Sequence, residues 1–305
     1  MGRAIGITLG DPAGIGPEIT AKALKRIGIS RAVLIGPQTV WEQVAKDVGL
    51  NVPKITVIDT GSPGKFVYGK AQKNCGATAY QALRIGVQLL KTGEISALVT
   101  APVAKAALRL AGFPYPGQTE FLAHNLGKTD YAMLAWSPTF RVIFVTIHLP
   151  LARVSAAITT KAVLKKIRLL WDFLLQEGFK NPLVGVFAFN PHGEEFSLGE
   201  EARIRRAVKR AQAMDINVKG PFPADAIFAQ LQQCHGFVAM YHDQAMIPAK
   251  LLARGKGVNV SLGLGRIRTS PLHGVAFDIA GKGVADPSSM IAALQLARKL
   301  AMRQQ

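Results

Sequence analysis

Three histidines sit where short apolar runs end, a placement that suits a metal site. Residues 141–147 end at His148, residues 183–189 lead to His192, and residues 237–240 lead to His242. Ligands of open α/β sheets gather outside the carboxyl ends of strands, so these imidazoles can converge despite their separation in sequence. Neutral imidazoles suit Zn²⁺ or a similar cation, and three protein ligands leave a position open for a substrate oxygen. Each histidine alone could equally be a hydrogen-bonded structural residue.

The stretch of residues 237–279 also supplies candidate anion-binding donors, Lys250, Asn259 and Arg268. Lysine offers a point charge, arginine a bidentate fork and asparagine a neutral donor. Their spacing is unspecific by itself, and it gains weight because the same stretch carries His242. Asp243, the next residue, is a candidate for orienting a metal ligand.

Short β-rich runs alternate with amphipathic helical stretches in the first half of the chain. We expect strands at residues 4–9, 32–35, 55–58 and 97–100, and helices at residues 17–26, 39–48 and 78–91. This alternation predicts an α/β fold whose mostly parallel sheet has helices on both faces. Prolines and glycines break the pattern in residues 111–127, which is typical of a segment that crosses between domains.

The glycine-rich stretch GDPAGIGPEI, residues 10–19, lies where the first expected strand meets the first expected helix. It is not GxGxxG, because position 19 is Ile, and it is not a P-loop, because no GK[ST] follows. Two interpretations stay open. The stretch is either a structural turn with Pro17 at the helix start or a ligand-facing loop with free backbone N–H groups.

Length and composition bound the class of protein. The 305 residues, of which 49% are hydrophobic, are enough for two ordinary domains and a substantial core. No apolar stretch approaches the roughly 20 residues that span a bilayer, and the N-terminus lacks a signal-peptide pattern. Cys75 and Cys234 form neither a metal-ligand pair nor a disulfide framework. We therefore expect a cytoplasmic protein without a membrane partner.

The net charge is strongly positive, because 37 Lys and Arg outnumber 19 Asp and Glu to give +18. Two stretches, residues 161–170 and 200–210, hold much of this charge. Apolar residues recur at helical spacing in the first, so its lysines are expected on the solvated face. Steering of an anionic substrate is a second interpretation. Nucleic acid is not expected as a partner, because no nucleic-acid-binding motif accompanies the charge.

The assembled motifs resemble the PdxA family, the 4-hydroxythreonine-4-phosphate dehydrogenases of vitamin B6 biosynthesis, over nearly the whole chain. The motifs that carry the resemblance are TLGDPAGIGPE (8–18), VTAPVAK (99–105), GQTEF (117–121), TIHLPL (146–151), NPHG (190–193), GPFPADAIF (220–228), MYHDQ (240–244), GVNVSLG (257–263) and RTS (268–270).

The resemblance implies a two-domain α/β fold of the isocitrate/isopropylmalate dehydrogenase type, with mixed sheets flanked by helices and a cleft between the domains. We expect a discontinuous first domain, residues 1–115 and 270–305, that holds the coenzyme loop. Residues 116–269 would form the second domain, with the metal and substrate residues and the dimer contact. The resemblance also implies a homodimer with a shared active site.

The family's site residues transfer to this sequence by position. His148, His192 and His242 match the ligands of one divalent metal ion per subunit (Zn, Co or Mg), with His242 serving the neighbouring subunit's site. Lys250, Asn259 and Arg268 match residues that hold the substrate, largely at its phosphate end, and Gln118 and Thr119 match the remaining contacts. Gln118 is a departure, because the family usually has histidine there, and it puts the exact substrate in doubt.

A second resemblance concerns the coenzyme. HGVAFDIAGKGVADPSSMI, residues 273–291, is similar to the coenzyme loop of isopropylmalate and isocitrate dehydrogenases. His273, Gly274, Asp278 and Ile279 are the implied contacts. Because the carboxylate matching Asp278 bonds the ribose 2′-hydroxyl, NAD is favoured over NADP.

The implied reaction is the NAD- and metal-dependent oxidation of 4-hydroxythreonine 4-phosphate, with decarboxylation to 3-amino-2-oxopropyl phosphate. Candidate bases are Lys105, Asp225 and Asp243. One alternative is a PdxA-like paralogue that oxidises threonate or erythronate 4-phosphate or an aromatic cis-dihydrodiol carboxylate. A distant alternative, which only the positive charge supports, is a non-catalytic basic binding protein.

Overall fold

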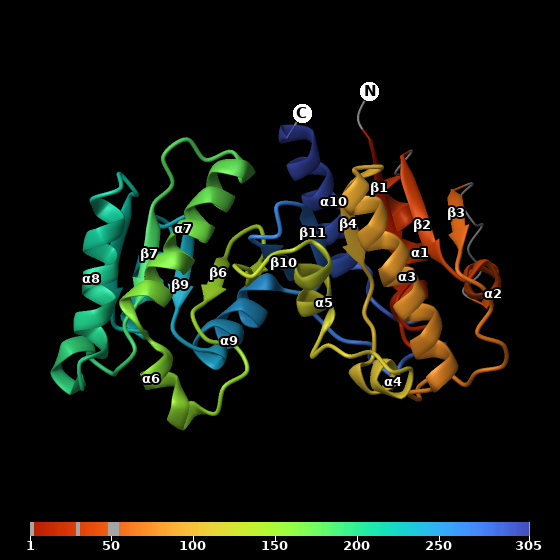
Figure 1. The fold of residues 1–305 in the computed structure, drawn as a ribbon, viewed down its shortest axis with the longest axis horizontal. Helices are drawn as coiled ribbons and strands as arrows, with labels where there is room; N and C mark the ends of the chain where they lie inside the picture. The colour runs from red at the N-terminus through yellow and green to blue at the C-terminus, as the bar shows by residue number, and fades with distance from the viewer. Residues whose placement is uncertain (1–2, 29–30, 48–54, 305) are drawn as a thin grey trace. The chain divides into compact units, whose positions relative to one another are not determined.

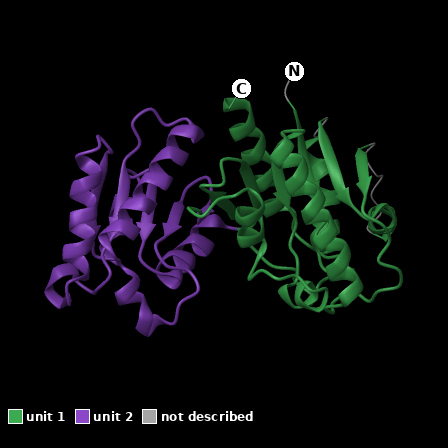
Figure 2. Ribbon diagram, in the orientation of Figure 1, with its two compact units in different colours: residues 1–131, 255–305 green, residues 132–254 purple. Residues whose placement is uncertain are grey.

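The computed structural model describes residues 3–28, 31–47 and 55–304, and the chain forms two compact units (Figure 2). Unit 1 comprises residues 1–131 and 255–305, and unit 2 comprises residues 132–254. The first unit is discontinuous in sequence, but its bounds differ from the predicted 1–115 and 270–305. Residues 116–131 and 255–269 belong to unit 1, because they pack and pair with its core.

Unit 1 is built on a sheet in the order β3-β2-β1-β4-β11-β10. Its strands are β1 (Ala4–Thr8), β2 (Ala32–Gly36), β3 (Thr56–Asp59), β4 (Ile95–Thr100), β10 (Val258–Leu262) and β11 (Ile267–Pro271). All neighbours run parallel except β10 and β11, which form an antiparallel pair. The predicted mostly parallel sheet is therefore confirmed.

Helices cover both faces of this sheet (Figure 1). They are α1 (Gly16–Ile27), α2 (Gln38–Asp47), α3 (Lys73–Thr92), α4 (Lys105–Leu110), α5 (Gln118–Asn125) and α10 (Ser288–Arg303). Leu98 of β4 packs against α3. The next residue, Val99, pairs with Thr269 of β11, and the Thr269 hydroxyl donates to the Ala293 carbonyl of α10 at 2.9 Å. Since adjacent strand residues point to opposite faces, α3 and α10 lie on opposite sides. Val48, the last residue of one predicted helix, lies outside the described residues.

The GDPAGIGPEI stretch forms a tight turn into α1, as one of its two interpretations predicted. The buried Asp11 carboxylate accepts the N–H of Ala13 at 3.0 Å, and the Asp11 carbonyl accepts the N–H of Gly14 at 3.0 Å. Burial raises the pKa of the Asp11 carboxyl, and the backbone hydrogen bonds of Ala13 and Ala104 only partly offset this effect. The N–H of Ile15 bonds the Val275 carbonyl. These N–H groups are therefore satisfied within the chain.

Residues 111–127 do not cross between domains, contrary to the prediction. They carry Phe113, Tyr115 and Phe121, whose rings meet one another with centroids 5.4–5.5 Å apart. Tyr80 of α3 joins the same cluster. The prolines and glycines shape a loop that folds back onto unit 1, because aromatic burial outweighs the irregular backbone.

The strands of unit 2 lie in the order β5-β6-β9-β7-β8. Its strands are β5 (Ala132–Trp136), β6 (Arg141–Phe144), β7 (Val184–Phe187), β8 (Val218–Phe222) and β9 (Gly236–Ala239). Its α-helices are α6 (Val154–Ala157), α7 (Thr160–Glu177), α8 (Glu200–Gln212) and α9 (His242–Ala253), with 3₁₀ turns at Leu151–Arg153, Gly193–Phe196 and Ala226–Gln230. The β5–β6 pair is antiparallel, and the other neighbours are parallel.

The basic helix α7 buries the apolar face that its sequence predicts, including Val163, Ile167 and Leu170. Thr159 caps it by accepting the N–H of Ala162 at 3.1 Å. One expectation about its lysines is wrong, since Lys166 is buried rather than solvated. Long lysine side chains can bury their aliphatic stems along an apolar surface.

Candidate active site

Arg268 lies at the centre of a polar cluster in unit 1. Its side chain is only 2% exposed. Nη2 donates to the Thr100 hydroxyl at 2.7 Å and to the Gln118 amide oxygen at 3.0 Å, and Nη1 donates to the Ser261 hydroxyl at 3.1 Å. Strands β4, β10 and β11 and helix α5 therefore converge on one guanidinium.

The guanidinium has neutral partners only. In the described part of the chain no carboxylate lies within ion-pair distance of Arg268. Burial lowers its pKa to about 10, while the charge of Glu120 acts in the opposite direction. The group thus stays cationic at neutral pH. A buried cation without a counter-charge is costly unless an anion completes its surroundings.

Two buried polar atoms lack a hydrogen-bond partner in the described residues, and both belong to residues on the same face of the sheet. Arg268 Nε and Asn259 Oδ1 are both buried and have no hydrogen-bond partner among the described residues. Asn259 pairs with Ser270 in the β10–β11 ladder. Strand alternation therefore places Asn259, Ser261 and Arg268 on one face. The structure thus brings together two residues that the sequence predicted as substrate contacts.

Helix α5 adds the other predicted pair, Gln118 and Thr119, at its first turn. The Thr119 hydroxyl lies 3.5 Å from the Ser261 hydroxyl. Gly117 precedes the helix in an extended conformation. The free N–H groups of a helix start favour an anion, so α5 adds donors beside Arg268.

In unit 2, three strand ends that carry histidines are tied together through Met240. The Met240 carbonyl accepts the Thr146 hydroxyl at 2.8 Å and the Thr146 N–H at 3.1 Å. The Met240 N–H donates to Gln244 Oε1 at 2.8 Å, and Gln244 Nε2 donates to the Ala188 carbonyl at 2.9 Å. These bonds link the ends of β6, β9 and β7, from which His148, His242 and His192 follow.

The rings of His148 and His242 lie near each other, whereas the ring of His192 lies near Phe196. The rings of His148 and His242 have centroids 6.3 Å apart, and His242 Nδ1 lies 2.7 Å from Asp243 Oδ1. His192 adopts a left-handed backbone with φ 54°, and its ring packs on Phe196. Among the residues the structure describes, no three His, Cys, Asp or Glu side chains group closely enough to hold a metal ion.

The loop that carries His192 is anchored by a buried carboxylate. Glu201 Oε1 accepts the N–H groups of Phe189 and Asn190 at 3.0 and 2.8 Å, and Oε2 accepts the Asn190 side-chain amide at 2.9 Å. Burial would raise the pKa of Glu201, but donors from Ser197 and Asn190 outweigh it and lower the pKa. An ionised Glu201 thus fixes the NPHG loop.

The chemistry of these donors fits a divalent cation. Neutral imidazoles are good ligands for zinc and related metals. A carboxylate on one ring nitrogen fixes the tautomer and leaves the other nitrogen for a metal. Asp243 occupies that orienting position on His242, as one of its predicted roles requires.

The loop similar to a coenzyme loop is held against α1. Glu18 Oε1 accepts the Ala285 N–H at 2.8 Å, and Lys22 Nζ donates to the carbonyls of Gly283 and Ala285 at 2.8 and 2.9 Å. Lys22 also pairs with Glu18 at 2.7 Å. Among the predicted contacts, His273, Gly274 and Asp278 are exposed, whereas Ile279 is half-buried. The loop therefore presents the Asp278 carboxylate to solvent, and its later part is bonded to α1.

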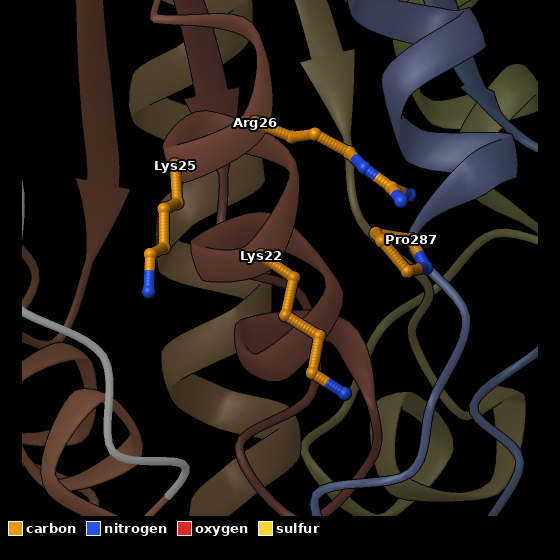
Figure 3. Close-up of a pocket in the computed structure, with 4 residues that line it drawn as sticks. All are labelled: Lys22, Lys25, Arg26 and Pro287. Carbon is orange, nitrogen blue, oxygen red and sulfur yellow. The ribbon is translucent and has the colours of Figure 1, made fainter.

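A pocket of about 490 Å³ lies beside this loop, lined by Lys22, Lys25, Arg26 and Pro287. Its three cationic side chains leave α1 in different directions (Figure 3). They do not converge on a single anion, in contrast to the donors around Arg268.

Other predicted residues have simpler surroundings. Lys105 starts α4, Lys250 lies near the end of α9, and Asp225 precedes a 3₁₀ turn; all three are exposed. The structure describes no hydrogen bond from any of them to another predicted site residue. They remain candidates on position alone.

Comparison with known proteins identifies the family. Residues 18–297 match the sequence model described as "Pyridoxal phosphate biosynthetic protein PdxA". The chain belongs to the PdxA family. It is 40% identical to the "Putative D-threonate 4-phosphate dehydrogenase" of Oceanobacillus iheyensis, with 97% of each chain covered. It is 38% identical to the 4-hydroxythreonine-4-phosphate dehydrogenase of Synechocystis sp., with 96% of this chain and 94% of that relative covered.

Solved structures of PdxA proteins share the fold. The 4-hydroxythreonine-4-phosphate dehydrogenase of Klebsiella pneumoniae is 34% identical, with a TM-score of 0.87 over 98% of this chain and 99% of that one. A terephthalate 1,2-cis-dihydrodiol dehydrogenase of Burkholderia xenovorans is 29% identical, with a TM-score of 0.70 over 97% and 98%. The isocitrate dehydrogenase of Methylococcus capsulatus, at 17% identity, has a TM-score of 0.51 over 97% and 84%. The predicted isocitrate dehydrogenase-like α/β fold is confirmed.

Membership of the PdxA family makes the protein a dehydrogenase. None of the described helices is both long and apolar enough to cross a membrane.

Several structurally central residues were not singled out in the sequence. They are Glu18, Thr100, Thr146, Glu201, Gln244 and Ser261. All except Glu201 lie inside the motifs that carry the PdxA resemblance, so the signal was present. Glu201 lies in residues 200–210, which were considered in the sequence only as a stretch rich in positive charge.

Proposed function

We propose that the protein oxidises 4-hydroxythreonine 4-phosphate with NAD and a divalent metal ion, and decarboxylates it to 3-amino-2-oxopropyl phosphate. The observation that carries the proposal is the buried Arg268 guanidinium, which has only neutral partners. Relatives of similar length are named for substrates that bear a phosphate. A phosphoryl group would supply the missing counter-charge.

The phosphate subsite would be formed by Arg268, Asn259, Gln118 and Thr119, with Lys250 as a further cationic contact. Arg268 offers its unused Nε–H, and Gln118 and Thr119 offer donors from the first turn of α5. These groups would bind and orient the substrate from its phosphate end. Such remote contacts hold the reacting carbon in place during the chemical step.

His148 and His192 would hold the metal ion together with His242 of a second copy in a shared active site. Asp243 would keep His242 in the tautomer that binds a metal, and Thr146 and Gln244 would keep the three strand ends in register. When bound, a zinc, cobalt or magnesium ion supplies Lewis-acid polarisation of the substrate hydroxyl.

The loop of residues 273–291 would bind NAD, with Asp278 accepting hydrogen bonds from the adenosine ribose. His273, Gly274 and Ile279 would contact the same coenzyme. When bound, NAD supplies the hydride acceptor. Lys105, Asp225 and Asp243 are the candidates for taking the hydroxyl proton, and Asp243 is already engaged with His242.

The test is a substrate panel with purified metal-loaded protein. We expect NADH to form from 4-hydroxythreonine 4-phosphate, and an Arg268→Lys variant to raise the KM by about tenfold or more because the bidentate fork is lost. No turnover of any phosphorylated hydroxy acid, together with salt-sensitive binding to duplex DNA, would instead favour the non-catalytic basic binding protein.

A second candidate substrate is threonate or erythronate 4-phosphate. It is supported by Gln118, which stands where histidine is usual in the family, and by the 40% identity to the Oceanobacillus relative. Turnover of threonate 4-phosphate without turnover of 4-hydroxythreonine 4-phosphate would establish threonate 4-phosphate as the preferred substrate. An aromatic cis-dihydrodiol carboxylate, suggested by the Burkholderia xenovorans structure, is less favoured because it would leave the Arg268 subsite without a phosphate.

A further inference from the structure

Gln118 and Arg268 form a contact whose polarity is fixed. Arg268 has N–H donors and no acceptor, so the atom of Gln118 that faces it at 3.0 Å is the amide oxygen. The amide nitrogen of Gln118 is therefore the other arm of the planar carboxamide and does not take part in this contact. In the described residues the side chain of Gln118 makes no hydrogen bond other than the one to Arg268, and it is half-buried. Gln118 thus presents two unused N–H groups next to an uncompensated cation.

The hydroxyl groups near Arg268 reinforce this arrangement. Thr100 and Ser261 accept from the guanidinium, and Thr119 stands beside Ser261 at 3.5 Å. Each hydroxyl accepts on one side and can donate on another. The cluster therefore gathers several donors around one position, which suits a tetrahedral oxyanion.

We propose that Gln118 is a specificity-determining residue that offers the anion only N–H donors and adds no titratable group to this oxyanion subsite. Its carbonyl orients Arg268, and its amide N–H groups bind an oxygen of the phosphoryl group. This inference rests on the proposed phosphate subsite and adds the role of one residue within it. A carboxamide neither gains nor loses a proton near neutral pH, so Gln118 leaves the charge of the subsite unchanged.

Helix α5 also carries two titratable side chains, Glu120 and His124. Glu120 of α5 is the carboxylate that acts on Arg268, and it also acts on Tyr131, whose pKa is raised mainly by burial. His124 lies in the last turn of α5, against Tyr115. Strands β4 and β10 contribute Thr100, Ser261 and Asn259, none of which ionises.

The test uses sulfate as the probe, because sulfate keeps its double charge between about pH 6 and pH 8.5, whereas phosphate titrates there. Sulfate binding to the full-length protein would be measured by calorimetry at constant ionic strength. We expect the dissociation constant of the wild-type protein to change less than about twofold over this range. In Gln118→His we expect it to tighten by about tenfold towards pH 6, as an imidazolium forms beside the anion.

Two further variants complete the design. Gln118→Glu places a carboxylate against Arg268 and is expected to weaken sulfate binding by about thirtyfold or more at every pH. Gln295→His introduces the same new histidine on the exposed face of α10 and is expected to match the wild type. Thermal melting of each variant verifies that the fold is retained.

The outcomes separate this inference from the proposed function. The role of Gln118 is overturned if the sulfate affinity of the wild type falls as the pH rises, with a midpoint near pH 6.5. It is also overturned if the sulfate affinity of Gln118→His does not change with pH. Either result leaves the anion subsite in place. A failure of sulfate to bind the wild type overturns both. A flat wild-type profile with a pH-dependent Gln118→His profile supports the inference even if a different phosphorylated substrate is turned over.

Discussion

The Glu18 carboxylate accepts the backbone N–H of Ala285 at 2.8 Å, although 267 residues separate them in the chain. This bond joins the start of α1 to the loop that resembles a coenzyme loop. Lys22 reinforces it by donating to two carbonyls of the same loop. Glu18, at the end of the motif of residues 8–18, therefore positions the loop of residues 273–291.

We expect Glu18→Ala to raise the KM for NAD by about fivefold or more, because the loop loses the acceptor of its Ala285 N–H. The KM for the phosphorylated substrate is expected to stay within about twofold. Steady-state kinetics with each ligand varied separately measures both effects. Glu42→Ala, at an exposed position of α2, is the matched control. Equal changes in both KM values would contradict a local role of Glu18.

Asp278→Ala is expected to reduce the preference for NAD over NADP by about tenfold, because an exposed carboxylate no longer repels a 2′-phosphate or accepts a ribose hydroxyl. The ratio of kcat/KM values for the two coenzymes measures this preference. Unchanged coenzyme kinetics would mean that residues 273–291 do not bind the adenosine end.

His148→Ala and His192→Ala are each expected to lose the bound metal and at least about a hundredfold in kcat, while the fold is retained. Metal content after dialysis and a circular dichroism melt separate the two effects. His124→Ala is the control, because His124 packs on Tyr115 in unit 1. Full metal retention in either ligand variant would rule out that histidine as a ligand.

Glu201→Gln is expected to destabilise the protein by about 1–3 kcal/mol at neutral pH, because the acceptors of the NPHG loop become weaker. The pKa of Glu201 is lowered in the folded state, so its contribution is present above the unfolded pKa of about 4.3. This contribution is lost as the pH falls through the folded pKa. Melting temperatures of variant and wild type are therefore expected to differ at pH 7 and to converge on acidification. A difference that persists below about pH 3 would contradict this origin.

Gln118→His is expected to raise kcat/KM for 4-hydroxythreonine 4-phosphate by about threefold or more, if an imidazole that can gain a proton serves this substrate better. Parallel assays with threonate 4-phosphate give the ratio of the kcat/KM values for the two substrates. A fall in activity on both substrates would indicate that the amide itself is adapted to the native substrate.

Local patterns predicted many elements because they report short-range preferences. Strand β1 and helix α1 were predicted to within about two residues. In the structure Pro17 stands in the first turn of α1, and Gly28, with a left-handed backbone, ends it. Unit boundaries were predicted less well. Phe121 looked like part of an irregular linker, and only its packing against Tyr80 and Phe113 assigns it to unit 1.

The sequence alone determined the family, the α/β fold and the identity of the candidate metal and substrate residues, because these depend on residue types in fixed order. The tertiary structure decided which of them meet. It placed the Gln118 amide oxygen on the Arg268 guanidinium and tied the ends of β6, β7 and β9 through Met240. Such contacts join residues far apart in the chain, and their geometry depends on how strands pair and which face each side chain takes.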